Sequence, residues 1–257
     1  MPLPLVRAEH SVAAPASLRG RVVLVTGAAG GLGRASALAC ARTGATVVLA
    51  GRKVAALEAV YDEIEALAAP QAAIYPVDLE GAGADDLAGI ADAVRIQCGR
   101  LDGLVHAAAR FDGLRTLEQT TPEEWTRTLK VDLHAPALLT RACLPLLRES
   151  ADPAVVFVFD DPERVGKAFW GGYGVSKFAL AGLAAILHEE TAGGRVRVHG
   201  LLPAPMRTAL RRMAYFGEDA RERATPDATG EAVAFLLGPD AAALRGRTLD
   251  LRPASAG

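Results

Sequence analysis

Short runs of consecutive apolar residues alternate along this chain with longer stretches in which apolar positions recur every three or four residues. The continuous runs predict strands over residues 22–25, 45–50, 74–77, 101–108, 154–159, 195–202 and 247–251. The helical spacing predicts helices over about 32–43, 54–67, 84–98, 121–147 and 173–192. We therefore predict an α/β fold, a single Rossmann-like, doubly wound parallel sheet of about seven strands with helices on both faces.

The beginning of the chain differs from the rest. Residues 1–18 contain Pro2, Pro4 and Pro15 and lack an apolar run of signal-peptide length, which predicts a flexible N-terminal leader. Residues 19–257 contain no low-complexity linker and no internal repeat. We expect these residues to form a single Rossmann-fold domain.

Composition argues against several classes of function. The chain has 257 residues, of which 51% are hydrophobic, and its net charge of −2 is not typical of a nucleic-acid-binding protein. No stretch reaches the roughly 18 apolar residues that span a membrane. Cys40, Cys98 and Cys143 are far apart and odd in number, which predicts reduced thiols. We expect a cytoplasmic protein with neither nucleic-acid nor membrane partners.

A glycine-rich segment follows the first long apolar strand. It reads Thr26-Gly27-Ala28-Ala29-Gly30-Gly31-Leu32-Gly33 and leads into the first helix. Glycines at such a turn let the backbone approach a pyrophosphate, which then lies at the positive end of the helix. A purely structural turn uses the same residues, but the position between a strand and a helix favours dinucleotide binding.

The end of the next strand distinguishes between cofactors. An acidic residue at this place binds the ribose 2′-hydroxyl of NAD, whereas this chain has Ala50-Gly51-Arg52-Lys53. The guanidinium of Arg52 would attract a 2′-phosphate. We therefore predict NADP(H) in preference to NAD(H), with a solvated basic helix start as the alternative.

Tyr173 and Lys177 supply the candidate chemistry. They stand four residues apart at the start of a predicted helix, so their side chains lie on one face, one turn apart. Because a nearby ammonium favours the phenolate, the pKa of the phenol is expected to fall, which would make Tyr173 a usable acid or base. After a nucleotide-binding turn, this pair indicates hydride-transfer chemistry.

Together these motifs resemble the short-chain dehydrogenase/reductase family, from about residue 18 onward. The glycine segment is similar to its cofactor signature, Tyr173 and Lys177 to its catalytic pair, and residues 203–208 to a segment whose threonine contacts the nicotinamide. The resemblance implies a small carbonyl or alcohol substrate, covered by a segment near residues 205–225. It implies cofactor contacts from Gly27, Gly31, Leu32, Gly33, Arg52, Asp78, Leu79, Ala108, Tyr173, Lys177 and Thr208.

Two residues depart from the catalytic tetrad of that family. The family has a serine, thirteen residues before the tyrosine, that binds the substrate oxygen, and an asparagine that supports a proton-relay water. This chain has Asp160 and Asp132 at those places. The whole sequence lacks asparagine, so coding bias accounts for Asp132. We still expect Asp132 and Asp160 among the catalytic residues.

Asp160 places a carboxylate where a carbonyl reduction builds negative charge. At about 4 Å from the phenol, it would oppose phenolate formation by roughly 4 kcal/mol at an effective dielectric constant of about 20. It would also repel an oxyanion. Three possibilities follow: Asp160 is protonated and donates a hydrogen bond, a shifted loop turns Asp160 and Asp161 outward, or the enzyme is slow or inactive.

Other polar residues have a structural and a functional interpretation. His106 follows an apolar run and is expected to bond to the backbone, with a proton relay as the alternative. Asp160, Asp161 and Glu163 could hold a divalent cation, but no second cluster of oxygen ligands accompanies them, so we predict no metal.

The last third of the chain carries two further expectations. We expect Arg207, Arg211 and Arg212 to lie on a solvated helix face, and the alternative is that they bind an anionic substrate or carrier. Close packing of the helix over residues 173–192 is favoured by the small residues Ala179, Ala181, Gly182, Ala184 and Ala185. The family resemblance implies that this helix forms a homodimer or homotetramer.

The expected function is that of an NADP(H)-dependent short-chain oxidoreductase, which transfers hydride between the nicotinamide and a carbonyl or alcohol substrate. Tyr173 would be the acid/base, and Lys177 would anchor the ribose. The alternative, motivated by Asp160, is a catalytically weak or inactive NADP-binding protein of the same fold.

Overall fold

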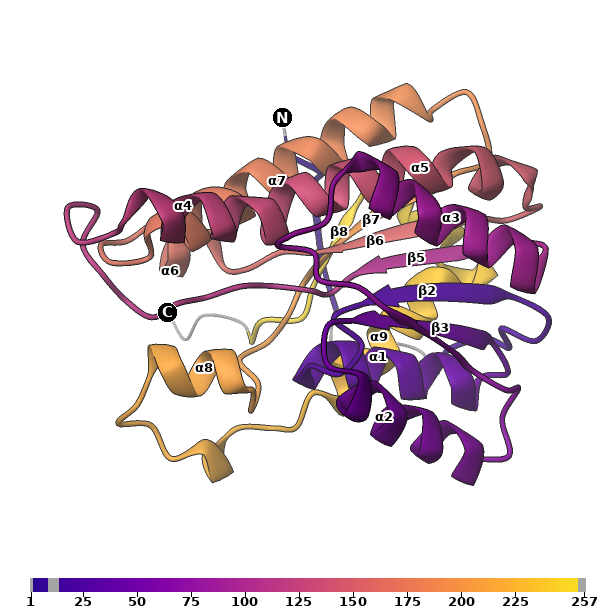
Figure 1. Ribbon diagram of the computed structural model, residues 1–257, viewed down its shortest axis with the longest axis horizontal. Helices are drawn as coiled ribbons and strands as arrows, with labels where there is room; N and C mark the ends of the chain where they lie inside the picture. The colour runs from indigo at the N-terminus through magenta and orange to yellow at the C-terminus, as the bar shows by residue number, and fades with distance from the viewer. Residues whose placement is uncertain (1, 9–13, 254–257) are drawn as a thin grey trace.

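The computed structural model describes residues 2–8 and 14–253, which form an eight-stranded parallel sheet between two layers of helices (Figure 1). The strands are β1 (Leu5–Arg7), β2 (Val22–Thr26), β3 (Thr46–Gly51), β4 (Ala73–Pro76), β5 (Gly103–His106), β6 (Ala154–Val158), β7 (Arg197–Leu202) and β8 (Thr248–Asp250). Every residue of β2, β5, β6, β7 and β8 is buried. Continuous apolar runs suit these strands because helices cover both faces of the sheet.

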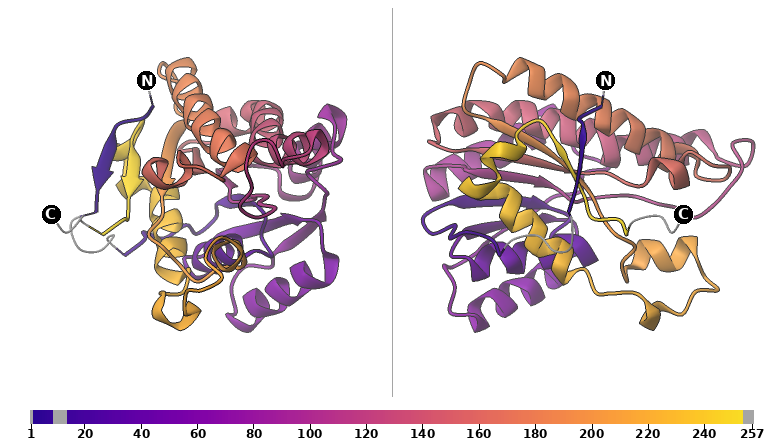
Figure 2. Two further views of the ribbon diagram at one scale, coloured as in Figure 1. Left: turned by 90° about the vertical axis from the view of Figure 1, so that its left-hand side faces the viewer. Right: turned by 180° about the vertical axis from the view of Figure 1, so that it is seen from behind.

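The helices divide between the two faces (Figures 1 and 2). One face is covered by α3 (Ala84–Cys98), α5 (Ala135–Glu149) and α7 (Gly171–Glu190), and the other by α1 (Gly31–Arg42), α2 (Val54–Ala66) and α9 (Asp227–Leu237). The shorter segments are α4 (Pro122–Leu129), η1 (Lys130–His134), α6 (Pro162–Val165), α8 (Ala209–Ala214), η2 (Ala220–Glu222) and η3 (Pro239–Leu244). The predicted doubly wound α/β architecture is confirmed.

The order of the strands locates the place where ligands bind such a sheet. It is β1-β8-β7-β6-β5-β2-β3-β4, so the chain builds outward from β2 in one direction through β3 and β4 and in the other through β5 to β8. β2 pairs with both β3 and β5. Open parallel sheets bind ligands outside the carboxyl ends of their strands at such a switch point.

The segment expected to be a flexible leader contributes an edge strand. β1 pairs in parallel with β8, with Leu5 opposite Thr248 and Arg7 opposite Asp250 (Figure 2, left). Leu3 is only 5% exposed and belongs to one hydrophobic core. The sequence pattern did not predict this strand, because a three-residue strand has too short an apolar pattern to detect. Residues 9–13 lie outside the described residues.

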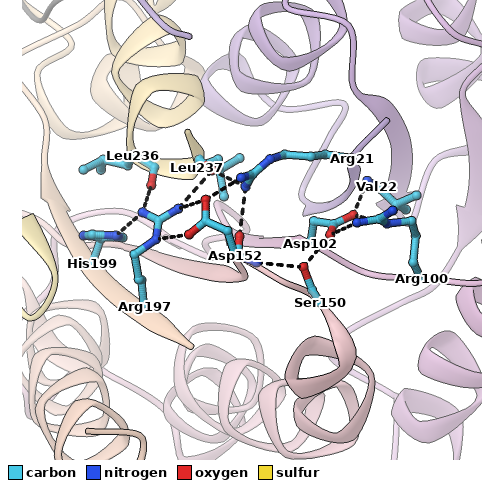
Figure 3. A network of polar contacts seen from close by, with 10 residues as sticks. All are labelled: Arg21, Val22, Arg100, Asp102, Ser150, Asp152, Arg197, His199, Leu236 and Leu237. Atoms are coloured by element: carbon cyan, nitrogen blue, oxygen red, sulfur yellow. Dashed lines mark hydrogen bonds and ion pairs between the residues drawn. The ribbon is translucent and has the colours of Figure 1, made fainter. Parts of the chain in front are cut away.

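A polar network ties the amino ends of the strands together (Figure 3). Asp152 accepts from Arg197 Nε at 2.8 Å and forms an ion pair with Arg21. Arg197 also donates to the carbonyl of Leu236 at 3.0 Å, at the end of α9. His199, which contacts Arg197, has its pKa lowered to about 3 by burial. This network lies at the opposite end of the strands from the switch-point loops, so we assign it a structural role.

Two further features bear on the sequence expectations, the state of the cysteines and the absence of a membrane span in the described residues. All three cysteines are free, and burial raises the pKa of Cys40 and of Cys143 to about 12. Within residues 2–8 and 14–253, the structure has no helix with the length and apolar character needed to cross a membrane.

Candidate active site

A cleft of about 1420 Å³ opens where β2 and β5 end. Its walls come from the glycine turn, the end of β3, the loop after β5, the start of α7 and the segment around α8. The predicted site residues that line it are Gly27, Gly31, Leu32, Arg52, Asp78, Leu79, Ala108, Asp160, Tyr173, Lys177 and Thr208. Gly33 and Asp132 are not among the lining residues, but Gly33 lies against Gly27 and Asp132 lies near Lys177.

The glycine turn requires its glycines. Gly27 has a φ of 65°, and a Cβ there would lie 2.7 Å from Ala108 Cα. A Cβ on Gly33 would lie 2.1 Å from the carbonyl oxygen of Gly27. The turn ends at Gly30, the N-cap of α1, where no side chain caps the helix. The first N–H groups of α1 are therefore free of side-chain partners, which suits a phosphate group.

The positions around the turn complete a surface for a dinucleotide. A Cβ on Gly31 would lie 3.1 Å from Thr208 Cγ2, so Thr208 closes the turn from the far side of the cleft. Arg52 and Lys53 are exposed at the end of β3, and both line the cleft. Asp78 is exposed, and its Oδ1 accepts from the N–H of Glu80 at 3.2 Å. The residues present fit an NADP(H) molecule.

Asp160 lies directly against the phenol of Tyr173. Tyr173 Oη donates to Asp160 Oδ2 at 2.6 Å, and the Asp160 side chain is 9% exposed. The other carboxylate oxygen accepts from the N–H of Asp161 at 2.7 Å and from the guanidinium of Arg164. Guanidinium, carboxylate and phenol thus form a continuous hydrogen-bonded chain in the wall of the cleft.

The pKa of Tyr173 is raised well above 10.0, whereas the sequence predicted a lowered pKa. Burial is the largest cause, and the charge of Asp160 and its hydrogen bond act in the same direction. Lys177 Nζ lies 5.3 Å from the centroid of the phenol ring. The prediction was wrong because burial and the adjacent carboxylate outweigh the ammonium.

The two aspartates after β6 point in different directions. Asp160 faces Tyr173, whereas Asp161 caps α6 by accepting from the N–H of Glu163 at 3.1 Å and pairs with Arg252 Nη1 at 2.7 Å. The idea that a shifted loop turns both outward is therefore wrong for Asp160. Among the described residues, no group of His, Cys, Asp and Glu side chains forms a metal-binding cluster.

Asp132 is buried next to Lys177. It sits in η1, a π-helical turn in which Ala135 N donates to the carbonyl of Lys130, and such turns are frequent at functional sites. Its Oδ1 accepts from the N–H of Arg110 at 2.6 Å, and its Oδ2 lies 4.0 Å from Lys177 Nζ. Burial raises the pKa of Asp132 to about 6, although Lys177 acts in the opposite direction.

The sequence pattern does not identify the aromatic and cationic residues that surround Asp160. Arg164 lies 4.8 Å from the ring centroid of Trp170 and 5.8 Å from that of Tyr215. Phe111 and Tyr173 meet edge to face, with centroids 5.3 Å apart. Of these residues, only Arg164 could have been located from the sequence. Asp161 followed by Pro162 is a pattern that starts a helix, and such a helix places Arg164 one turn after Asp160.

The remaining candidates have mainly structural roles. His106 Nε2 lies 2.8 Å from Thr140 Oγ1, so its partner is a hydroxyl and not the expected backbone group. Burial lowers the pKa of His106 to about 3, which keeps the ring neutral. Arg211 lines the cleft and binds both oxygens of Glu218, at 2.5 and 2.8 Å, whereas Arg207 and Arg212 are exposed as expected.

Comparison with known sequences finds one matching family model and full-length relatives. The model, described as short chain dehydrogenase, matches residues 21–217. The uncharacterized oxidoreductase YciK of Escherichia coli K12 is 34% identical over 236 residues, which cover 92% of this chain and 93% of the relative. D-threitol dehydrogenase of Mycolicibacterium smegmatis is 32% identical over 254 residues, which cover 94% of this chain and 95% of the relative.

Solved structures of related proteins share the fold. The oxidoreductase YciK from E. coli has a TM-score of 0.89 at 33% identity and covers 95% of this chain and 100% of its own. A protein of E. coli CFT073 described as a short chain dehydrogenase, solved in complex with NADPH, has a TM-score of 0.87 at 34% identity. That match covers 92% of this chain and 98% of the relative.

Proposed function

The chain belongs to the short-chain dehydrogenase family, and from this premise we propose that it is an NADP(H)-dependent oxidoreductase. It would transfer hydride between the nicotinamide and a small-molecule substrate, for which the family resemblance implies a carbonyl or alcohol. The observation that carries the proposal is the cleft that brings together the glycine turn, Arg52 and the pair Tyr173 and Lys177.

Each part of the cleft has a proposed task toward the cofactor, which supplies the hydride when bound. The N–H groups of Gly31 and Leu32 would bind the pyrophosphate, and Arg52 the 2′-phosphate. Lys177 would bind the nicotinamide ribose, and Thr208 the nicotinamide amide. Five further residues shape the adenine side and the turn: Gly27, Gly33, Asp78, Leu79 and Ala108.

Tyr173 is the proposed group that contacts the reacting atoms. Because its pKa is raised, it holds its proton at neutral pH. Asp160 fixes the direction of that proton, and Asp132 lies beneath Lys177 and offsets part of its charge. These assignments make Tyr173 and Lys177 the catalytic pair and the two aspartates its charged surroundings.

Calorimetric titration with NADPH and NADH tests the cofactor assignment. We expect NADPH to bind more tightly, and Arg52→Ala to weaken its binding by roughly 10- to 100-fold, since a charge-assisted hydrogen bond is worth about 1.5–3 kcal/mol. Arg148→Ala, an exposed position on α5 outside the cleft, is the matched control. Equal affinities for NADPH and NADH in the wild type would rule out the NADP preference.

The hydrogen bond between Tyr173 and Asp160 favours a second candidate, a catalytically weak or inactive NADP-binding protein. Turnover decides between the two. We expect NADPH consumption by the wild type that disappears in Tyr173→Phe, while NADPH binding is retained. Binding of NADPH without any turnover that depends on Tyr173 would favour the inactive protein.

We also propose a cytoplasmic homodimer or homotetramer. Three apolar side chains on one stripe of α7 support the assembly, since Val175, Phe178 and Ile186 are 48%, 51% and 58% exposed. Three free cysteines, two of them buried, agree with a reducing compartment. Light scattering of the purified protein tests the assembly, and a monomer mass of 26.7 kDa would contradict it.

A further inference from the structure

Asp160 reverses the hydrogen-bonding character of the reaction site. A neutral tyrosine hydroxyl has one proton to donate and two lone pairs that accept. Tyr173 Oη gives its proton to Asp160 Oδ2 at 2.6 Å. Only acceptor lone pairs of the phenol therefore remain for a bound substrate, whereas a carbonyl oxygen needs a donor.

The neighbouring donors are also engaged. The N–H of Asp161 donates to Asp160 Oδ1 at 2.7 Å, and the guanidinium of Arg164 binds the same oxygen. Lys177 Nζ lies 3.5 Å from the carbonyl of Val158 and is assigned to the cofactor ribose. Asp160 Oδ2 and the phenol thus present lone pairs beside Tyr173 Oη, and the carboxylate charge, which Arg164 offsets from the Oδ1 side, opposes a developing oxyanion.

We propose that this site takes a substrate with a protonated carbon–nitrogen double bond, an iminium, whose N–H donates to Asp160 Oδ2 or to Tyr173 Oη. The inference rests on the proposed function, because the reaction still uses NADPH. It replaces the expected carbonyl with an imine as the hydride acceptor.

Aromatic rings beside Asp160 favour the same class of substrate. Phe111, Tyr173 and Tyr215 line the cleft together with Asp160. The faces of aromatic rings attract cations, and the Tyr215 ring already does so, since Arg164 and Arg211 lie 5.8 and 4.6 Å from its centroid. Arg164 is bound to Oδ1, the carboxylate oxygen that does not contact the phenol. A flat, cyclic iminium matches this combination of rings and carboxylate.

The reduction balances without an acid in the site. The iminium carbon gains the hydride that NADPH supplies, and the C=N π pair becomes a lone pair on nitrogen. The cofactor leaves as NADP⁺, and the released amine takes a proton from water. Tyr173 keeps its proton throughout, which agrees with a pKa that burial and Asp160 raise well above its ordinary value.

NADPH consumption with a matched pair of bicyclic substrates tests the inference. We expect kcat/KM for the imine 3,4-dihydroisoquinoline to exceed that for the ketone 1-tetralone by roughly 10-fold or more, the worth of one charge-assisted hydrogen bond.

Variants of Asp160 test the same preference. Asp160→Ser should lower kcat/KM for the imine by roughly 10- to 100-fold and raise kcat/KM for the ketone. Asp160→Asn, which keeps the shape and removes the charge, should also lose the imine activity. A faster ketone in the wild type, or an unchanged ratio in Asp160→Ser, overturns the inference.

Equilibrium binding provides a readout that does not depend on turnover. The 1,2,3,4-tetrahydroisoquinolinium cation and neutral 1-tetralol, neither of which NADPH can reduce, are titrated into the NADPH complex. We expect the cation to bind more tightly to the wild type, and this preference to disappear in Asp160→Ser; equal affinities in the wild type overturn the inference.

Two controls separate the possible failures. Thermal denaturation and NADPH affinity show whether each Asp160 variant is folded. If NADPH does not bind to the wild type, the proposed function and the inference both fail. If NADPH binds and the ketone is preferred, only the inference fails. If NADPH binds and neither substrate is reduced, the proposed turnover fails, and the cation titration decides the inference.

Discussion

Asp132 and Asp160 are two carboxylates near one phenol, and their surroundings differ. Asp160 has the guanidinium of Arg164 as a direct partner, whereas the nearest cation to Asp132 is Lys177 Nζ at 4.0 Å. Asp132 is also the more deeply buried, at 1% exposure. Burial outweighs the attraction of Lys177 and raises the pKa of Asp132 to about 6.

This titration makes stability depend on pH. The pKa of Asp132 is about 6 in the folded protein. An exposed aspartate has a pKa of about 3.9. Between about pH 4 and pH 6, Asp132 is therefore protonated in the folded protein and ionised in the unfolded chain. The contribution of this proton is complete below about pH 4 and is lost as the pH rises through about 6. We expect the wild type to lose roughly 1 kcal/mol relative to Asp132→Asn between about pH 5 and pH 7.

Urea denaturation of both proteins across this range measures the difference. Taking the difference between the two proteins removes the contributions of all other titrating groups that the substitution leaves unchanged. A free-energy difference that stays constant with pH, or that changes in the opposite direction, would contradict the raised pKa.

The sequence predicted correctly those parts of the site whose residues lie close together along the chain. The glycine turn, Tyr173 and Lys177 lie together in the cleft as predicted, because strand, turn and helix follow one another directly in the sequence. The direction of the Tyr173 pKa shift was not predictable, since it depends on how deeply the phenol is buried and on which way Asp160 points.

At the scale of elements, the contact between α1 and α9 depends on a helical glycine. A Cβ on Gly230 would lie 2.5 Å from the backbone carbonyl carbon and oxygen of Ala35. Gly230→Ala should therefore force the helices apart and cost about 1–3 kcal/mol of stability. Because α1 begins at the glycine turn, the same substitution is expected to weaken NADPH binding.

Gly89, inside α3, is the matched control. A Cβ there would meet only Tyr75 Oη, at 3.5 Å, which is an ordinary contact. We expect Gly89→Ala to be neutral or to stabilise by about 0.5–1 kcal/mol, because alanine restricts the unfolded chain. Thermal or urea denaturation compares the two variants, and equal effects would show that the close helix contact is not what limits residue 230.

Elements with strong local signals were predicted closely. The helix expected over residues 84–98 is α3, Ala84–Cys98. A capping box starts α4, with Thr121 Oγ1 accepting from Glu124 N at 3.2 Å. The short α6 was not predicted, because its four residues are too few to show a helical period. Its position nevertheless brings Arg164 to Asp160.

For the whole molecule, the pairing of β1 with β8 joins the two ends of the described chain. Arg7 lies 3.9 Å from Asp250, Arg252 lies 2.9 Å from the same carboxylate, and Arg252 also pairs with Asp161. Leu3 anchors this edge in the core, whereas Leu5 is 57% exposed. The start of the chain is thereby connected to the loop that carries Asp160.

The two leucines give a test of this edge. We expect Leu3→Ala to lower the free energy of unfolding by about 2–3 kcal/mol, because it leaves a cavity in the core. Leu5→Ala should stay within about 0.5 kcal/mol of the wild type, as exposed substitutions do. Denaturation of the full chain measures both, and a Leu3→Ala protein as stable as Leu5→Ala would show that the beginning of the chain is not anchored.

The amino-acid sequence by itself determined the α/β architecture, the glycine turn and the placement of Tyr173 and Lys177 on one helix face. Each depends on the spacing of neighbouring residues, and local geometry then fixes which side chains share a face. Only the tertiary structure decided the edge strand β1 and the contact between Asp160 and Tyr173. These contacts join distant segments, so their geometry and burial have no counterpart in sequence spacing. The chemistry that we infer for Tyr173 follows from that contact, because a hydrogen bond to a carboxylate turns a proton donor into an acceptor.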